Sequence, residues 1–303
     1  MIVNYKAVIQ AVNEKKSISE AFIQPEGGRT LENIHVESIQ TGYGDKVIID
    51  DLSIKIPMGK TTAIIGPNGC GKSTLLKSIG RILNIKKGAI YLDGKEIHKM
   101  PTRELAGKLA ILPQAPVAPE GLTVEELISY GRYPYQKGLG KLKAEDKKII
   151  NWAMAATNLE ALKYDTVDNL SGGQRQRVWI AMALAQETDV ILLDEPTTYL
   201  DMAYQMEVLE LLEELNKEHG CTIIMVLHDL NLASRYADFM VAMGAGKIIK
   251  AGAPKEVMTE EVLEAVYRIR ANIVSDPDTG CPVCLSYGLL NKSKDRKLIK
   301  RGA

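Results

Sequence analysis

The chain has 303 residues, of which 46% are hydrophobic and 25% charged, as in a globular protein with one large domain or two modest ones. Lys and Arg together number 38, as do Asp and Glu, and 5% of residues are aromatic, so the composition disfavours a protein that binds nucleic acid or an anionic membrane. No apolar run approaches the ~18 residues of a membrane helix, the start does not resemble a secretory signal, and four cysteines are too few for a disulfide scaffold, so we expect a reducing, cytoplasmic compartment.

The first part of the chain is weakly patterned and ends in the breaker cluster "PEGGRT". We interpret residues 1–33 as an N-terminal extension rather than a domain. The segment that follows, "IHVESIQTGYGDKVIIDDLSIKI", alternates polar and apolar residues around a turn, which predicts short antiparallel strands.

Four apolar runs then predict buried strands: "TTAII", "LAILP", "VILLD" and "TIIMVL". Helical patterns cover residues 72–83, 174–187, 203–218 and 229–236. Strands that alternate with helices predict an α/β core with a largely parallel sheet. Residues 115–170 contain no strand-like apolar run and many helix formers, so we expect an inserted helical subdomain there.

The stretch "GPNGCGKST", residues 66–74, fits the pattern G-x-x-x-x-G-K-[ST]. Its glycines allow a loop whose backbone N–H groups all face inward toward phosphates. Lys72 is expected to reach the β- and γ-phosphates, and the Ser73 hydroxyl to ligate Mg²⁺. A predicted strand precedes the loop and a predicted helix follows it, so the pattern predicts a nucleotide site.

The run "VILLDEP" supplies acidic residues at the end of an apolar strand. Asp194 is expected to reach the Mg²⁺ shell. Glu195 follows at once, and a carboxylate beside the metal that is not needed as a ligand is suited to polarise a water molecule. We predict that Glu195 is the general base.

A second anion-binding element begins at "LSGGQRQR", residues 170–177. Ser171 is a good helix N-cap, and the two glycines that follow let the backbone approach a ligand. Because the first loop already has its phosphates, metal and base, we infer that this helix start serves a phosphate bound to another molecule. Two copies arranged head to tail would then hold ATP in their interface.

These motifs resemble the ATPase subunit of an ABC transporter, and "LSGGQRQR" is similar to the signature motif of that family. The resemblance covers roughly residues 34–290 and implies a dimer that sandwiches two ATP molecules. It also implies a P-loop NTPase core with an antiparallel β subdomain and an inserted α-helical subdomain. The implied domains are 34–260 for the ATPase, with the helical part at about 115–170, and 261–303 for a C-terminal segment with a short strand pair and a basic tail.

The resemblance carries over to further single residues. Tyr43 resembles the aromatic that stacks on adenine, Gln114 the glutamine that touches Mg²⁺ and the attacking water, and His228 the histidine that contacts the γ-phosphate. Asp201 resembles the aspartate through which the subunits sense each other, although Tyr199 stands where the family usually has a small residue.

The implied site falls into three sets. The catalytic set is Glu195, His228 and Gln114, and the metal set is Ser73, Gln114 and Asp194. The ATP-binding set is Tyr43, Gly66, Pro67, Asn68, Gly69, Cys70, Gly71, Lys72, Ser73, Thr74, Ser171, Gly172, Gly173, Gln174 and Asp201.

The implied partners are a second ATPase subunit, integral membrane permease subunits and, indirectly, a periplasmic or extracellular solute-binding protein, with no nucleic acid. The implied location is the cytoplasmic face of the cell membrane. The pieces "GRYPYQ" and "DEPTTYLD" and the tail "RIRANIVSDPDTGCPVCLSYG" are similar to ATPases that import iron–siderophore complexes, haem or cobalamin. The alternatives are an importer of zinc, manganese or another small solute, a soluble ATPase of the family that acts on DNA or ribosomes, and a nucleotide-binding scaffold that does not hydrolyse ATP.

Three features fall outside this scheme. We interpret Cys281 and Cys284, in "CPVC", as incidental residues of a surface hairpin, because one pair supplies half of a structural zinc site. Cys70 lies beside Lys72 and a helix start, which predicts a lowered thiol pKa and alkylation that blocks ATP binding. We expect the basic tail "NKSKDRKLIKRGA" to be a solvated end, with contact to lipid headgroups as the alternative.

Overall fold

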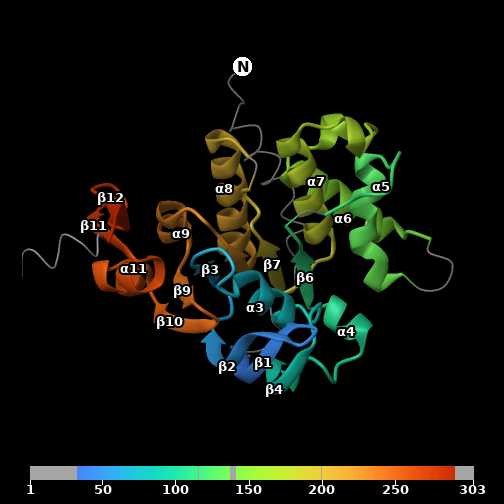
Figure 1. Cartoon of the computed structure of the whole chain (residues 1–303). Helices are drawn as coiled ribbons and strands as arrows, with labels where there is room; N and C mark the ends of the chain where they lie inside the picture. The colour runs from blue at the N-terminus through green and yellow to red at the C-terminus, as the bar shows by residue number, and fades with distance from the viewer. Residues whose placement is uncertain (1–32, 115, 137–140, 199, 291–303) are drawn as a thin grey trace, which may run out of the picture. The chain divides into compact units, whose positions relative to one another are not determined.

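The computed structural model describes residues 33–114, 116–136, 141–198 and 200–290. The chain divides into two units, Met1–Leu31 and Glu32–Ala303, and the described residues all belong to the second (Figure 1). The predictions for residues 1–32, Tyr199 and the tail beyond residue 290 therefore lie outside the described part.

The helices are α3 (Lys72–Ile79), α4 (Thr102–Ala106), α5 (Val124–Ser129), α6 (Ala144–Ala156), α7 (Gly172–Ala185), α8 (Met202–His219), α9 (Leu230–Tyr236), α10 (Pro254–Val257) and α11 (Glu260–Tyr267), with 3₁₀ turns η1 (Tyr130–Tyr135), η2 (Glu160–Leu162) and η3 (Val167–Asn169). The strands are β1 (Ile34–Tyr43), β2 (Lys46–Ile56), β3 (Thr61–Ile65), β4 (Ile85–Leu92), β5 (Lys95–Glu96), β6 (Leu109–Leu112), β7 (Val190–Asp194), β8 (Thr222–Val226), β9 (Phe239–Gly244), β10 (Lys247–Gly252), β11 (Ile269–Ser275) and β12 (Pro282–Leu289).

The predicted antiparallel strands form one side of a four-stranded sheet with the order β2-β1-β4-β5. β1 and β2 make a hairpin whose last pair is Tyr43 and Lys46. β4 pairs with β1 on the other side, also antiparallel. The alternating pattern predicted the hairpin, because one face of such a sheet is buried and the other is exposed.

The core is a six-stranded sheet with the order β10-β9-β3-β8-β7-β6. β9, β3, β8, β7 and β6 run parallel to one another, and β10 pairs antiparallel with β9. All four apolar runs in the sequence are strands of this sheet. The predicted α/β class with a largely parallel sheet is confirmed.

Both faces of this sheet are buried, which explains why its strands are apolar throughout. Within β3, Ala63 and Ile65 point into the core beneath the helices, whereas Ile64 points into the core shared with α3 and the four-stranded sheet. Successive strand residues face opposite sides, so a strand covered on both sides needs apolar residues at every position.

The described part of residues 115–170 contains helices and 3₁₀ turns and no strand, as predicted. α5 begins at Thr123, whose side chain accepts from the Glu126 amide while Glu126 accepts in return from the Thr123 amide. This reciprocal capping explains the helix start. α5 and α6 both pack against α7, so the insertion is built around the helix that carries the signature motif.

Three expectations need correction. The helix predicted at 72–83 ends at Ile79, because Gly80 and then Arg81, with φ of 55°, break the helical path. Strands β4 and β5 were not predicted, because "KKGAIYLDGKE" has no long apolar run. Nor were β9 and β10 predicted, although "FMVAMGAGKIIKAG" carries a turn between two apolar segments.

The C-terminal part consists of α10, α11 and the antiparallel pair β11–β12, which is the predicted short strand pair. β12 contacts α9, and α11 contacts β9, so this part packs against the layer of the six-stranded sheet. The domain boundaries at residues 34, 260 and 261 stay predictions.

Candidate nucleotide-binding site

Four neighbouring parallel strands end at the same edge of the six-stranded sheet, and a predicted site residue follows each end. β3 leads into the loop Gly66–Thr74, and β7 ends at Asp194. Gln114 lies two residues after β6, and His228 two residues after β8. The order β3-β8-β7-β6 places these ends side by side, at the position where open α/β sheets bind ligands.

The loop after β3 needs glycine at two positions. A Cβ on Gly66, where φ is 149°, would lie 2.3 Å from the carbonyl oxygen of Met243. Gly71 caps α3 with φ of 109°. The first turn of α3 leaves its amide groups without partners inside the helix, so the loop and the helix start together present N–H donors.

Lys72 is buried, with 4% of its surface exposed. Its Nζ donates to the carbonyl oxygens of Gly66 at 2.8 Å and Pro67 at 3.1 Å. In the part of the chain that the structure describes, no carboxylate forms an ion pair with it. A buried cation without a counter-ion is costly, so this position favours binding of an anion.

Asp194 lies within hydrogen-bond reach of the loop. Ser73 Oγ donates to its Oδ1 at 2.7 Å, and Lys77 Nζ is 3.7 Å from its Oδ2. Oδ2 is buried and accepts no hydrogen bond from the described residues. Mg²⁺ prefers hard oxygen ligands. The Ser73 hydroxyl and the Asp194 carboxylate supply such oxygens, and Oδ2 accepts no hydrogen bond from the described residues, so this cluster fits the metal.

Glu195 is held by three side chains from three places in the sequence. His228 Nε2 is 2.7 Å from its Oε1, and Thr198 Oγ1 donates to Oε2 at 3.1 Å. The Gln114 amide also donates to Oε2 through Nε2. Glu195 has a φ of 57°, a conformation uncommon outside glycine that turns the chain sharply after β7. The structure thus brings the predicted Gln114, Glu195 and His228 together.

The sequence patterns did not predict two residues of this cluster. Lys77 lies four residues after Ser73, on the same face of α3, and Thr198 lies three residues after Glu195. The helical spacing of Ser73 and Lys77 is a signal that could have identified Lys77. Thr198 lies in a turn of the "DEPTT" segment, where residue spacing does not predict which side chains meet.

The signature segment starts α7 as predicted. Ser171 is the N-cap and accepts from the Gln174 amide, while Gln174 Oε1 accepts from the Ser171 amide at 2.9 Å. Ser171 and Gly172 are exposed and Gly173 is buried. Among the described residues, no hydrogen bond joins Ser171–Gln174 to the loop Gly66–Thr74.

Two other predicted residues lie at the ends of elements. Tyr43 ends β1 and is 50% exposed. Asp201 is the N-cap of α8, and its Oδ1 accepts from the Tyr204 amide at 3.1 Å.

Cys70 contradicts one prediction. The thiol is buried, with 4% of the residue exposed, and burial raises its pKa above the ordinary value. The Lys72 charge and the backbone amides of Cys70 and Lys72 act to lower the pKa but do not outweigh the burial. The expectation of a lowered pKa is therefore wrong, because the thiol is buried in the core shared with α3 and burial disfavours the charged thiolate.

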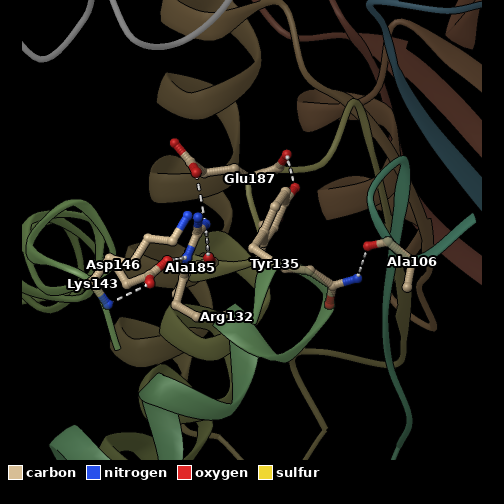
Figure 2. Close-up of polar contacts among 8 residues, drawn as sticks. Ala106, Arg132, Tyr135, Lys143, Asp146, Ala185 and Glu187 are labelled. Atoms are coloured by element: carbon tan, nitrogen blue, oxygen red, sulfur yellow. Dashed lines mark hydrogen bonds and ion pairs between the residues drawn. The ribbon is translucent and has the colours of Figure 1, made fainter. Parts of the chain in front are cut away.

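In the segment "GRYPYQ", Gly131 and Arg132 are buried, whereas Tyr133 is 78% exposed (Figure 2). The Arg132 guanidinium, 4% exposed, lies between two carboxylates, with Nε 2.9 Å from Asp146 and Nη1 2.6 Å from Glu187. It also donates to the Ala185 carbonyl at 2.8 Å, at the end of α7. The Tyr135 ring lies 4.2 Å from the guanidinium carbon. This network joins η1, α6 and the end of α7.

Cys281 and Cys284 lie on the predicted hairpin. Cys281 precedes β12 and Cys284 is within it, so extended chain separates them. Three residues of strand span about 10 Å, which is too far for a disulfide. Cys284 is buried, and burial raises its thiol pKa. The described residues contain no group of three or more His, Cys, Asp or Glu side chains that could hold a metal ion.

No helix among the described residues has the length and apolar character needed to cross a bilayer.

Comparison with known proteins shows a family match. The profile of a family described as "ABC transporter" matches residues 49–198. The chain is 55% identical to the iron(3+)-hydroxamate import ATP-binding protein FhuC of Bacillus subtilis, over 88% of this chain and 98% of that protein. It is 54% identical to the achromobactin transport ATP-binding protein CbrD of Dickeya dadantii, over 82% and 92% of the two chains. It is 47% identical to the ferric enterobactin transport ATP-binding protein FepC of Escherichia coli, over 86% and 96%.

Solved structures give the same result. A chain of a metal-chelate type ABC transporter in an inward-facing conformation superposes with a TM-score of 0.73 and 27% identity, covering 87% of this chain and 99% of that chain. An ATP-binding cassette dimer in a post-hydrolysis state, bound to ADP and phosphate, superposes with a TM-score of 0.65 and 28% identity, covering 73% and 98%.

Proposed function

Because this chain belongs to the ABC transporter family, we propose that it is the ATP-hydrolysing subunit that powers import of a ferric chelate of the siderophore type, haem or cobalamin through a separate membrane permease. The relatives that carry ferric hydroxamate, achromobactin and ferric enterobactin in their names support the ferric chelate. The observation that carries the ATPase activity is the Glu195 carboxylate, held by His228, Thr198 and Gln114 beside Asp194.

Each charged group of the site has a role that follows from its position. Lys72, buried without a counter-ion, binds the β- and γ-phosphates together with the amide groups of the loop Gly66–Thr74. Ser73 and Asp194 would hold Mg²⁺, which when bound neutralises charge on the phosphate oxygens. Gln114 donates to Glu195 through Nε2, so its amide oxygen is free to complete the metal set. Tyr43 stacks on the adenine ring.

Hydrolysis then follows from the orientation of Glu195. Its carboxylate accepts a proton from a water molecule whose oxygen attacks the γ-phosphorus, and the bond to the β-phosphate oxygen breaks to give ADP and phosphate. His228 and Thr198 hold the two carboxylate oxygens, and His228 is exposed enough to contact the γ-phosphate as well. Pre-positioned side chains lower the barrier because they need no reorganisation.

The site is completed by a second subunit. Ser171–Gln174 present a capped helix start and exposed backbone, and no hydrogen bond among the described residues links them to the loop of the same chain. We place them on the γ-phosphate of a partner copy, with Asp201 at the same interface. ATP then favours the closed pair and ADP releases it, which is a population shift.

Partners and location follow from transport. A permease crosses the membrane, this subunit lies against its cytoplasmic face, and a solute-binding protein delivers the chelate on the outer side. The second candidate function is to power import of zinc or manganese. The same nucleotide-binding site would hydrolyse ATP equally well for that transport.

The test is purification of a tagged Glu195→Gln variant from native cells in Mg-ATP. Loss of the carboxylate stops proton transfer, so the closed complex should persist and carry a multi-span membrane protein with it. The matched control is Lys72→Ala, which should not close and should recover less of that protein. Recovery of ribosomes, DNA or soluble proteins alone would overturn the transport function and leave the ATPase activity standing.

The solute is tested in cells that lack the gene. Wild-type protein, but not Glu195→Gln, should restore uptake of ⁵⁵Fe-loaded hydroxamate or catecholate siderophore. Restoration of ⁶⁵Zn or ⁵⁴Mn uptake with no effect on iron chelates would favour the second candidate.

A further inference from the structure

The first turn of α8 touches the first turn of α7. Asp201 is the N-cap of α8, and Tyr204 is the third residue of the helix. A Cβ on Gly173, the second residue of α7, would lie 3.2 Å from Cγ of Tyr204 and 3.4 Å from both Cδ atoms. Nearly equal distances to these three atoms mean that the flat face of the ring lies against the Gly173 backbone. The ring occupies the space where a side chain would otherwise stand.

A second contact lies one turn further along both helices. The Arg177 guanidinium is 5.8 Å from the centre of the Tyr204 ring, and Arg177 Nη1 is 3.5 Å from Oε2 of Glu207. Gly173 and Arg177 are four residues apart on α7, and Tyr204 and Glu207 are three apart on α8, so each pair shares a helix face. The Tyr204 ring is the centre of this contact.

The backbone of Tyr204 is also tied to Asp201. The Tyr204 amide donates to Oδ1 of Asp201 at 3.1 Å, so a hydrogen bond links the residue that caps α8 to the residue whose ring supports α7. The contact therefore joins the start of α8 to the Ser171–Gln174 segment within one subunit.

We propose that Tyr204 is a positioning residue that holds the first turn of α7 so that Ser171–Gln174 meet the ATP bound to the partner subunit. The proposal rests on the proposed function, in which the two subunits complete each other's sites. Its consequence is directional: loss of the ring impairs hydrolysis in the partner's site and not in the site of the same chain.

The ring, rather than the hydroxyl, makes the contacts on Gly173 and Arg177. Tyr204→Phe keeps the ring and should behave as the wild type, whereas Tyr204→Leu keeps an apolar side chain but removes the flat face. Tyr164, which is 77% exposed, provides the matched control as Tyr164→Leu.

The experiment uses heterodimers of two differently tagged copies, purified by both tags and assembled with the permease. One copy carries Glu195→Gln, so one site alone turns over, and it uses the signature segment of the Glu195→Gln copy. With Tyr204→Leu placed in the Glu195→Gln copy, kcat should fall by about tenfold or more, since lost transition-state contacts cost rate. With Tyr204→Leu in the other copy, kcat should stay within about twofold of the reference heterodimer.

Equal loss in both arrangements, with a lowered Tm, would mean that Tyr204 only supports the fold and would overturn the proposal. Loss confined to the second arrangement, or no loss in either, would overturn it too. A separate heterodimer with Ser171→Arg in the Glu195→Gln copy tests the shared site itself. If that heterodimer keeps full activity, the head-to-tail site of the proposed function fails, and the role of Tyr204 falls with it.

Discussion

Two buried charges of opposite sign lie at the end of the sheet. Lys72 has carbonyl partners and no carboxylate among the described residues, and one oxygen of Asp194 is buried without a hydrogen bond from them. In a folded protein such groups are costly unless a ligand of opposite charge compensates them. Lys77 Nζ, 3.7 Å from that oxygen, supplies part of the compensation for Asp194, and a phosphate and a divalent cation would supply the rest for both groups.

Cys70 gives a prediction about a single residue. Because burial raises its thiol pKa, little thiolate exists near neutral pH, and alkylation by iodoacetamide should be slow and should rise about tenfold per pH unit. The partly exposed Cys281 should be labelled first, as read by mass spectrometry of tryptic peptides. Rapid labelling of Cys70 at pH 7 would contradict the burial. Once attached, the adduct should still block ATP binding.

Among the elements, α7 has a defined anchor at each end. Its first turn carries Ser171 and lies against Tyr204, and its last turn is fixed by Arg132 through the Ala185 carbonyl and Glu187 (Figure 2). Gln186, the C-cap, donates to the Ala106 carbonyl at 2.6 Å, which ties the helix end to α4. The "GRYPYQ" segment thus has a structural role within the helical subdomain.

The Arg132 network predicts a large stability effect. Arg132→Met leaves the buried Asp146 and the half-buried Glu187 without this cation, which costs about 3–5 kcal/mol, so Tm should fall by roughly 5–10 °C in a thermal melt. Lys217→Met is the control, because its ion pair with Glu213 lies on the exposed surface of α8 and should contribute under about 0.5 kcal/mol. Equal shifts for the two variants would contradict the role of the network.

The Asp146 carboxyl makes the stability of the folded chain depend on pH. Burial raises its pKa, but the Lys143 amide and Arg132 outweigh that effect, and the net pKa is lowered. The stabilisation that Asp146 contributes is therefore complete above the ordinary carboxyl pKa and is lost as pH falls through the lowered value in the folded state.

For the whole molecule, the proposed head-to-tail dimer predicts that the ATPase activity depends on protein concentration. If each site needs the partner's Ser171–Gln174, the ATPase activity per subunit of the free protein should fall on dilution. The same subunits held on a permease should show no such fall. A constant activity per free subunit across a hundredfold dilution would contradict the shared site.

Motifs and strands were accessible to sequence reasoning for a physical reason. Residues 66–74, Asp194, Glu195 and the four apolar strands are contiguous patterns, and parallel strands bring their carboxyl ends to one edge of a sheet. The family resemblance, and not that rule, pointed to Gln114 and His228, and the structure places both side chains against Glu195. The helical insertion and the β1–β2 hairpin were accessible because their periodicities are local.

What depends on contacts between distant residues was decided by the tertiary structure. The burial of Cys70, the Arg132 network and the pairing of β4 with β1 and of β9 with β3 depend on packing against segments far along the chain. The Tyr204 ring meets Gly173 across 31 positions of sequence, which no local pattern encodes. The sequence by itself determined the chemistry at the strand ends, because that chemistry lies in short motifs. Only the folded chain decided which distant side chains support those motifs, because side-chain packing depends on the shape of the whole core.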